Sequence, residues 1–370
     1  MIYFDNSAST PLTPEVKEAF LEEMEYFANP SSLHRLGFEA EQRMKKARST
    51  VAATLMARED EIVFTGGGTE ADNLGILGAA RKMRRRGNRI LSTDSEHPAA
   101  EECLKLLEAE GFEVIRLSTK GGALDPEEIK TAANDKTILA AVMHTNNETG
   151  AVYDIPALSR AVKGKNPECL VFCDAVQGYG KSLLIPSRMG IDLMAISSHK
   201  IHGPKGVGAL YVKKGISLPP LLLGGGQERG LRSGTENLPG IVAFAKACEI
   251  ARRDLLGNRE KMEGLRSVIL EGLEGEERVK FHLPANPSPH VLSMEVAGFR
   301  SEVLLHALSE KEVFVSSGSA CSSHKGKSPV LKNFGVDEKG QDSTIRLSFS
   351  SLNTAEEGKA FVSILKELLR

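Results

Sequence analysis

Short apolar runs alternate with amphipathic stretches over the first two thirds of the chain. Between residues 62 and 212, the segments that separate these runs have apolar residues at helical spacing. Strands buried on both faces of a parallel sheet are almost wholly apolar, and parallel strands need long, usually helical, crossovers. The pattern therefore predicts an α/β domain whose mostly parallel sheet is covered by helices on both faces. We expect the strands at 62–64, 89–91, 114–117, 138–143, 170–173, 193–196 and 209–212.

The pattern differs on both sides of this region. Pro14 directly after Thr13 predicts that a helix over 13–27 begins there, with apolar side chains on one face. Residues 216–232 are rich in glycine and proline, which predicts a long ordered loop. The apolar residues of the first helix are Val16, Phe20, Met24 and Phe27.

After the loop, the pattern is typical of a smaller α+β unit. A helical stretch over 238–273 comes first, and a chain of 370 residues usually forms more than one domain. We therefore expect an N-terminal arm over 1–14 that packs with the small domain, a large domain over 15–245 and a small domain over 246–370. The other elements expected in the small domain are strands at 291–296, 313–315 and 344–347 and helices near 302–308 and from 355.

Charge and composition exclude several classes of partner. Lys and Arg total 47 against 49 Asp and Glu, which leaves no broad basic surface for nucleic acid or an anionic membrane. The basic run at 81–86 ends an expected helix, where the helix dipole favours positive charge. The N-terminus lacks a signal-peptide pattern, and no apolar run approaches the roughly 18 residues that span a bilayer. We therefore expect a cytoplasmic protein that binds neither nucleic acid nor a membrane.

The five cysteines are scattered and odd in number, which indicates reduced thiols rather than a disulfide framework. Cys169 and Cys173 border an expected buried strand, where they are more typical of core residues than of metal ligands. No resident metal is therefore expected.

The glycine-rich segment TGGGTE at 65–70 lies between an expected strand and a helix that contains Leu74, Ile76 and Leu77. Glycine lets the backbone approach a phosphate, and the free amides at a helix start attract an anion. The segment matches neither the Walker nor the GxGxxG pattern. A phosphate site and a tight structural turn therefore both remain open from these residues alone.

Two reactive residues follow later strands. Asp174 ends an apolar strand, where ligands of open α/β sheets bind, and a carboxylate there needs a cationic partner. Lys200 follows the next strand; alone it could be a surface charge, but a lysine in a partly apolar site can form a Schiff base with an aldehyde. Together, a phosphate loop, an acid and such a lysine meet the needs of pyridoxal phosphate.

At this point the sequence resembles the cysteine desulfurases of the NifS/IscS kind, which belong to the class V aminotransferase family. The resemblance spans almost the whole chain, with its motifs in order. It implies fold type I of the pyridoxal-phosphate-dependent transferases, a cofactor-binding large domain and a small domain that carries a catalytic cysteine loop. The matching motifs are DNSASTP (5–11), NPSS (29–32), EH (96–97), NNE (146–148), DAVQ (174–177), SHK (198–200), QERG (227–230), RSGTEN (232–237) and SSGSAC (316–321).

The resemblance assigns cofactor roles by position. Lys200 becomes the Schiff-base lysine, and Asp174 the carboxylate that keeps the pyridine nitrogen protonated. His97 is expected to stack on the ring and to assist proton transfers, while Asn147 and Gln177 hydrogen-bond around the ring hydroxyl. The residues expected at the phosphate are Gly68, Thr69, Ser197 and His199, with Thr235 reaching the phosphate of the other subunit of a homodimer.

The resemblance also assigns the substrate site and the reaction. Arg346 is expected to bind the α-carboxylate of L-cysteine through its planar fork, with Asn147 beside it. Lys200 then removes the α-proton, and the thiolate of Cys321, in a small polar stretch, attacks the substrate sulfur. Alanine leaves and Cys321 carries a persulfide. This sulfur is expected to pass to an acceptor, an iron–sulfur scaffold or a tRNA-thiolation protein, and Cys321 could ligate a cluster transiently.

The chain departs from these relatives in places, and other interpretations compete. Segment 66–69 is unusually rich in glycine, and 322–329 carries two lysines and a histidine in place of an acidic run with proline. The last helix ends near Arg370 without the tail that helps IscS-type relatives dock their scaffold, so docking is expected to differ. A class V aminotransferase, a selenocysteine lyase and a non-catalytic dimer are the alternatives. The context of Cys321 favours desulfuration, and intact Lys200 and Asp174 argue against a scaffold.

Overall fold

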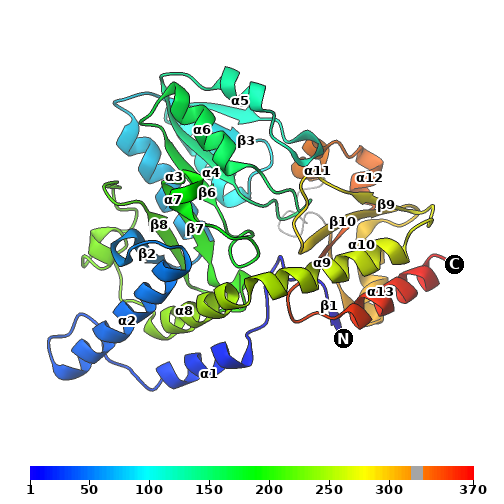
Figure 1. Cartoon of the computed structure of the whole chain (residues 1–370), viewed down its shortest axis with the longest axis horizontal. Helices are drawn as coiled ribbons and strands as arrows, with labels where there is room; N and C mark the ends of the chain where they lie inside the picture. Colours follow the sequence, from blue (N-terminus) through cyan, green and yellow to red (C-terminus); the bar gives the residue numbers. More distant parts are fainter. Residues whose placement is uncertain (318–327) are drawn as a thin grey trace.

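A seven-stranded sheet forms the centre of the larger of two lobes in a computed structural model that describes residues 1–317 and 328–370 (Figure 1). The strand order is β2-β8-β7-β6-β5-β3-β4. β8 alone runs opposite to the other six strands, so the predicted mostly parallel sheet is confirmed. The strands are β2 (Ile62–Thr65), β3 (Arg89–Thr93), β4 (Glu113–Leu117), β5 (Thr137–Met143), β6 (Leu170–Asp174), β7 (Leu193–Ser197) and β8 (Gly208–Val212).

Helices cover both faces of this sheet, as predicted. Successive side chains of a strand point to opposite faces. In β5, Leu139 and Ala141 accordingly pack with α3 and α4, whereas Ala140 and Val142 pack with the helices of the other face. The helices of this lobe are α1 (Pro14–Glu23), α2 (Arg35–Thr54), α3 (Gly68–Met83), α4 (Pro98–Ala109), α5 (Pro126–Ala132), α6 (Ile155–Lys165), α7 (Pro186–Met189) and α8 (Leu238–Arg253).

Two predicted helices have different bounds. The first ends at Glu23 rather than at 27, because Val16 and Phe20 reach the core while Met24 and Phe27 are 57% and 88% exposed. The stretch over 238–273 is two helices, α8 and α9 (Leu255–Gly272), which meet at the non-helical Asp254. They run one after the other along both lobes in Figure 1.

The long loop over 216–232 is ordered, as predicted, because buried contacts hold it. Glu228 is almost fully buried and accepts hydrogen bonds from both terminal nitrogens of Arg48 at 2.6 and 2.7 Å and from the Phe64 amide at 2.9 Å. Farther along, Arg232 pairs with Glu70 of α3 at 2.9 Å. Short 3-10 turns occur at η1 (Glu59–Glu61), η2 (Lys120–Gly122), η3 (Ser198–Lys200) and η4 (Glu228–Gly230).

The smaller lobe is an antiparallel sheet of order β12-β13-β10-β9 packed against helices, so the α+β prediction is confirmed. The strand predicted at 313–315 is β11, which ends at Phe314, whereas β9, β12, α11 and α12 were not predicted. The elements are β9 (Val279–His282), β10 (Val291–Val296), β11 (Val313–Phe314), β12 (Ser316–Ser317), β13 (Thr344–Ser348), α10 (Ser301–Glu310), α11 (Pro329–Phe334), α12 (Glu338–Asp342) and α13 (Ala355–Leu368).

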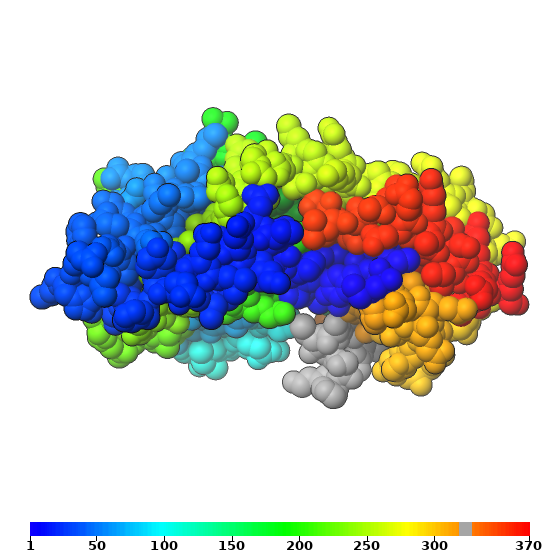
Figure 2. Space-filling view, turned by 90° about the horizontal axis from the view of Figure 1, so that it is seen from below, coloured from blue at the N-terminus to red at the C-terminus, as the bar shows by residue number. Residues whose placement is uncertain are grey.

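The N-terminal residues connect the two lobes. β1 (Ile2–Tyr3) pairs in parallel with β11, and the Phe4 ring lies edge-on against Phe349 at 5.1 Å between centroids. In Figure 2 the dark blue N-terminal segment runs along the surface from the smaller lobe towards α1 on the larger one. This path places the backbone at residues 5–10 beside the carboxyl ends of β7 and β13.

Candidate active site

A cavity, here called the central cavity, lies where the carboxyl ends of β5, β6 and β7 meet the arm and the smaller lobe. These three strands are parallel, so their ends share one edge of the sheet. Ten of the twelve residues predicted for the site line it: Gly68, Thr69, His97, Asn147, Asp174, Gln177, Ser197, His199, Lys200 and Arg346.

The glycine-rich loop lies at one side of the central cavity and lines a space, here called the cradle, whose residues suit an anion. The cradle is open, shares Gly68, Thr69, Ser197 and His199 with the central cavity and is also lined by Lys205. Helix α3 begins at Gly68, where the first backbone amides have no intrahelical acceptor. A Cβ atom on Gly68 would lie 2.7 Å from a methyl group of Val176, so this position requires glycine.

Lys200 ends the 3-10 turn η3, directly after β7. Its Nζ donates hydrogen bonds to the backbone carbonyls of Ser7 and Ala8, the latter at 3.0 Å. The turn itself is fixed by the arm, because the Thr10 amide donates to the His199 carbonyl at 3.0 Å. The arm therefore positions Lys200, a contact that the sequence pattern did not indicate.

Buried acids form the floor of the central cavity. Asp174 is 5% exposed and accepts a hydrogen bond from the Val176 amide at 2.9 Å. Burial raises the pKa of Asp174, although His97 and Lys200 oppose the rise. Asp72 of α3 is 1% exposed, one of its oxygens has no hydrogen-bond partner in the described part of the chain, and burial and Asp174 raise its pKa well above the ordinary value. These oxygens provide acceptors for a cationic N–H group in the cavity.

His97 is held in one orientation at the start of α4. Its Nδ1 accepts a hydrogen bond from the Ala99 amide at 3.1 Å, so Nε2 is the nitrogen that remains for a ligand. Burial lowers the pKa of His97, which leaves the ring neutral at pH 7. Gln177 is oriented by the arm, because its amide nitrogen donates to the Ser7 carbonyl at 3.0 Å.

Arg346 brings a cation from β13 of the smaller lobe into the central cavity. The residue is 4% exposed. Its two terminal nitrogens donate to Asp5 at 2.7 Å and to the Asn147 carbonyl at 3.0 Å, while its buried Nε has no partner in the described residues. A guanidinium held in this way is ready to bind a carboxylate.

Glu148 is a cavity residue that sequence reasoning did not assign, although the NNE motif at 146–148 includes it. Burial raises the pKa of Glu148 to about 7, opposed by the hydrogen bond that it accepts from Ser328 at 2.6 Å and by Arg346. Ser7 and Asp72 also line the cavity. The motif at 5–11 contains Ser7, whereas nothing in the sequence marks an aspartate within a helix.

The comparisons with known proteins agree with this geometry. The family model described as aminotransferase class-V matches residues 2–361. The chain belongs to the class-V aminotransferase family. It is 38% identical to a NifS/IcsS protein homologue of Lactobacillus delbrueckii subsp. bulgaricus, over all of this chain and 97% of that protein. It is equally identical to a cysteine desulfurase IscS of Methanosarcina thermophila, over all of this chain and 92% of that protein.

Solved structures of similar proteins have the same architecture. A NifS-like protein superposes with a TM-score of 0.94 at 37% identity, over all of this chain and 99% of that one. SspA in complex with cysteine superposes with a TM-score of 0.82 at 31% identity, over 94% of this chain and 99% of that one. The predicted fold type I is therefore confirmed.

Two predicted site residues do not line the central cavity. Thr235 is exposed in the loop after η4, and Cys321 lies outside the described residues.

The other four cysteines are buried free thiols, and Cys169 and Cys173 belong to the core of the larger lobe. Within residues 1–317 and 328–370, no helix is long and apolar enough to cross a membrane, and no group of three His, Cys, Asp or Glu side chains could hold a metal ion.

Proposed function

We propose that this class-V family member is a pyridoxal-phosphate-dependent cysteine desulfurase, which converts L-cysteine to L-alanine and leaves a persulfide on Cys321. The observation that carries the proposal is the meeting of Lys200, Asp174 and Arg346 in one cavity beside the glycine-lined cradle. Relatives over the whole chain are named cysteine desulfurases, and a solved neighbour is described in complex with cysteine.

The residues present fit the cofactor. Gly68, Thr69, Ser197 and His199 would hold its phosphate, because glycine and helix-start amides surround the cradle that they share with the central cavity. Asp174 would pair with the protonated ring nitrogen, which offsets the burial that now raises its pKa. When bound, pyridoxal phosphate supplies an electron sink for the substrate carbon. His97 would lie on the ring, and Asn147 and Gln177 beside the ring hydroxyl.

The chain's own groups would then carry out the proton and sulfur transfers. Arg346 would bind the substrate carboxylate, and the Lys200 nitrogen would take the α-proton. The Cys321 thiolate would attack the substrate sulfur; a sulfur–sulfur bond forms and the carbon–sulfur bond breaks. Two protons delivered to the remaining carbon skeleton give L-alanine.

The neutral state of His97 also follows from its surroundings. Burial lowers its pKa, so the ring can lie beside the cofactor without adding a second positive charge next to Lys200. In that position Nε2 could move a proton to or from the substrate sulfur. His97 is therefore proposed to act together with Lys200.

We also propose a cytoplasmic homodimer that passes sulfur to an acceptor protein, an iron–sulfur scaffold or a tRNA-thiolation protein. Thr235 is exposed and does not line the cradle of its own chain in the described residues. Leu223, in the same loop region, is 84% exposed, which is typical of a surface that a partner covers. Light scattering of the purified protein tests the dimer; a monomer at micromolar concentration would contradict it.

Product analysis tests the reaction. The purified protein should absorb at about 400 nm, and L-cysteine with dithiothreitol should give alanine and sulfide in equal amounts. Absorbance without sulfide, together with amino transfer to an α-keto acid, would instead indicate an aminotransferase. Lys200→Ala should remove the absorbance band, and its persistence in this variant would contradict the assignment of Lys200.

A further inference from the structure

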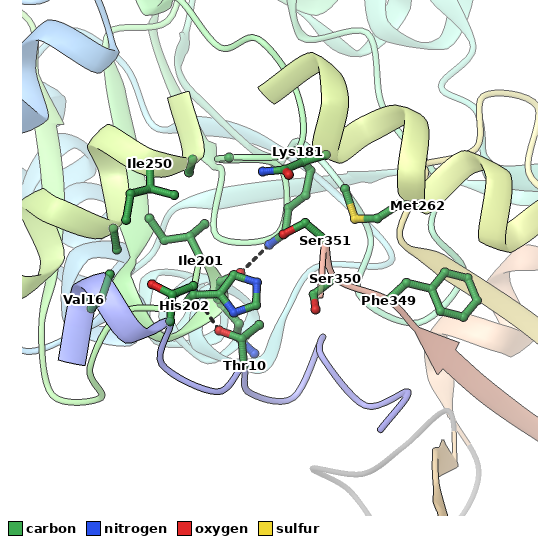
Figure 3. A pocket seen from close by; sticks show the side chains of 16 residues that line it. Thr10, Val16, Lys181, Ile201, His202, Ile250, Met262, Phe349, Ser350 and Ser351 are labelled. Carbon is green, nitrogen blue, oxygen red and sulfur yellow. Dashed lines mark hydrogen bonds between the residues drawn. The ribbon is translucent and has the colours of Figure 1, made fainter. Parts of the chain in front are cut away.

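A second lysine lies directly behind Lys200. Lys181 is 8% exposed, and its Nζ donates a hydrogen bond to the backbone carbonyl of Lys200 at 2.7 Å. In Figure 3 the dashed line from Lys181 marks this bond. Within the described residues, no carboxylate forms an ion pair with Lys181. It is therefore a buried amine that is hydrogen-bonded to the turn that carries Lys200.

The surroundings of Lys181 are unfavourable to a charge. It lines a cavity between the lobes whose wall combines apolar side chains with polar ones and contains no carboxylate among the described residues (Figure 3). The polar residues of the wall, besides Lys181 and Lys200, are Thr10, Thr13, His202, Asn258, Ser350 and Ser351. Burial and the positive charge of Lys200 lower the pKa of Lys181 to about 7. A buried ammonium without a counter-ion is costly. The apolar wall is formed by Val16, Ile201, Ile250, Met262 and Phe349.

A hydrogen bond alone does not explain this choice of residue. The carbonyl of Lys200 needs one donor, and an uncharged amide would supply it at a lower desolvation cost than an ammonium. What a lysine adds is its positive charge next to a second amine. Repulsion between two amines is mutual, so each makes protonation of the other less favourable.

We propose that Lys181 is a positioning residue for Lys200, which fixes the carbonyl of its turn and whose charge disfavours protonation of the Lys200 nitrogen. The inference rests on the proposed function, in which that nitrogen must be free of its proton to accept the α-proton of the substrate. An amine that stayed protonated could not act as the base. Lys181 would thus act through Lys200 without contacting the substrate.

Other charged groups also face the Lys200 nitrogen. Asp174 is the acidic one, and it favours protonation whichever residue occupies position 181. The histidines among these groups are neutral, because burial lowers their pKa values. Arg346 is a second cation that lines the central cavity with Lys200, but it is unchanged in variants of Lys181, so these variants report the effect of Lys181. The groups that interact with Lys200 electrostatically include His97 on α4, Asp174 on β6, Lys181 after β6, His199 on η3 and His290 before β10.

The test is a pH titration of the absorbance of the holoenzyme, which reports protonation of the Lys200 nitrogen bonded to the cofactor. Lys181→Gln keeps a hydrogen-bond donor for the carbonyl but loses the charge. In this variant the midpoint of the pH titration should rise by about one unit, which is a tenfold higher proton affinity of the Lys200 nitrogen. Lys181→Arg should return it to within about 0.3 units of wild type. Lys213→Gln is the control, because Lys213 pairs with Asp192 away from the cavity.

Two results would overturn the inference. One is a midpoint in Lys181→Gln equal to that of wild type; the other is a shift in Lys181→Arg as large as in Lys181→Gln. Lys181→Met is the second variant: an apolar chain of similar length suits this cavity, and its midpoint should rise as in the glutamine variant. Wild-type protein without an absorbance band would instead contradict the proposed function, so the two failures are distinguishable.

Discussion

Replacing Arg346 with lysine separates the shape of the guanidinium from its charge. Arg346 is fixed from two sides, by Asp5 at 2.7 Å and by the Asn147 carbonyl at 3.0 Å, and its Nε remains without a partner among the described residues. A lysine keeps the positive charge but loses the planar fork that pairs with both oxygens of a carboxylate. One charge-assisted hydrogen bond is worth about 1.5–3 kcal/mol. The KM for L-cysteine should therefore rise roughly 10- to 100-fold in Arg346→Lys.

Arg346→Lys should weaken only the binding of the substrate carboxylate and should leave the rest of the cavity and the fold nearly unchanged. The Asp5 side chain is 21% exposed and lysine keeps the positive charge, so we expect the loss in unfolding free energy to be that of a weakened buried hydrogen bond, about 1–3 kcal/mol. Steady-state sulfide release gives kcat and KM, and spectral titration gives the affinity for cysteamine, which lacks a carboxylate. The affinity for cysteamine should be the same in wild type and variant. Arg300→Lys, at a residue whose side chain is 76% exposed, is the matched control.

Two results would refute this reasoning. A KM within twofold of wild type would mean that Arg346 does not bind the carboxylate. An equal weakening for cysteine and cysteamine would mean that the substitution disturbs the cavity as a whole.

Three further predictions concern sulfur transfer, the cradle and pH. Cys321→Ser should lower the rate of alanine formation at least about 100-fold. Cys103→Ser is the control and should not change this rate, because burial raises the pKa of the Cys103 thiol to about 12 and leaves it unreactive. Equal rates in both variants would contradict the role of Cys321. Gly68→Ala should weaken retention of the cofactor in equilibrium dialysis, because the added Cβ atom would lie 2.7 Å from a methyl group of Val176. Adding Val176→Ala to the same chain should restore part of this retention. Unchanged retention in Gly68→Ala would contradict the close packing of Gly68 against Val176. Burial raises the pKa of Glu96 in the folded state to about 8, above its unfolded value of about 4.3. The bound proton therefore stabilises the folded protein below about pH 4.3, and this stability is lost as the pH rises to about 8. In urea unfolding, Glu96→Gln should therefore gain stability relative to wild type across this window, by roughly a few kcal/mol, and a constant difference from pH 4.5 to 8 would contradict the burial argument.

The central sheet was predictable because its strands are buried on both faces. Such strands are continuous apolar runs, and each of the seven predicted runs lies in a strand. Helix ends were less predictable. Phe27 continues the apolar spacing of α1 but finds no core to pack against, and Asp254 interrupts a pattern that reads as one helix.

The sequence predicted that distant residues meet in one place, and ten of the twelve line one cavity, but it did not predict the contacts that orient them. Residues that follow parallel strands, such as Asp174 and Lys200, converge because the strand ends share an edge. The contacts that orient them depend on the arm, which is far from them in sequence. Asp5 pairs with Arg346 across 341 positions, and Ser7 contacts Lys200 across 193. No local pattern encodes such pairs, and none marks Lys181 as a residue of the site.

Mass spectrometry of the protein after a single turnover with L-cysteine, in the absence of reductant, tests the persulfide on Cys321 directly. The peptide containing Cys321 should gain the mass of one sulfur atom, one alanine should be released per modified site, and dithiothreitol should remove the added mass as sulfide. Release of alanine with the added sulfur on another cysteine, or no alanine from protein that absorbs at about 400 nm, would contradict the formation of this persulfide.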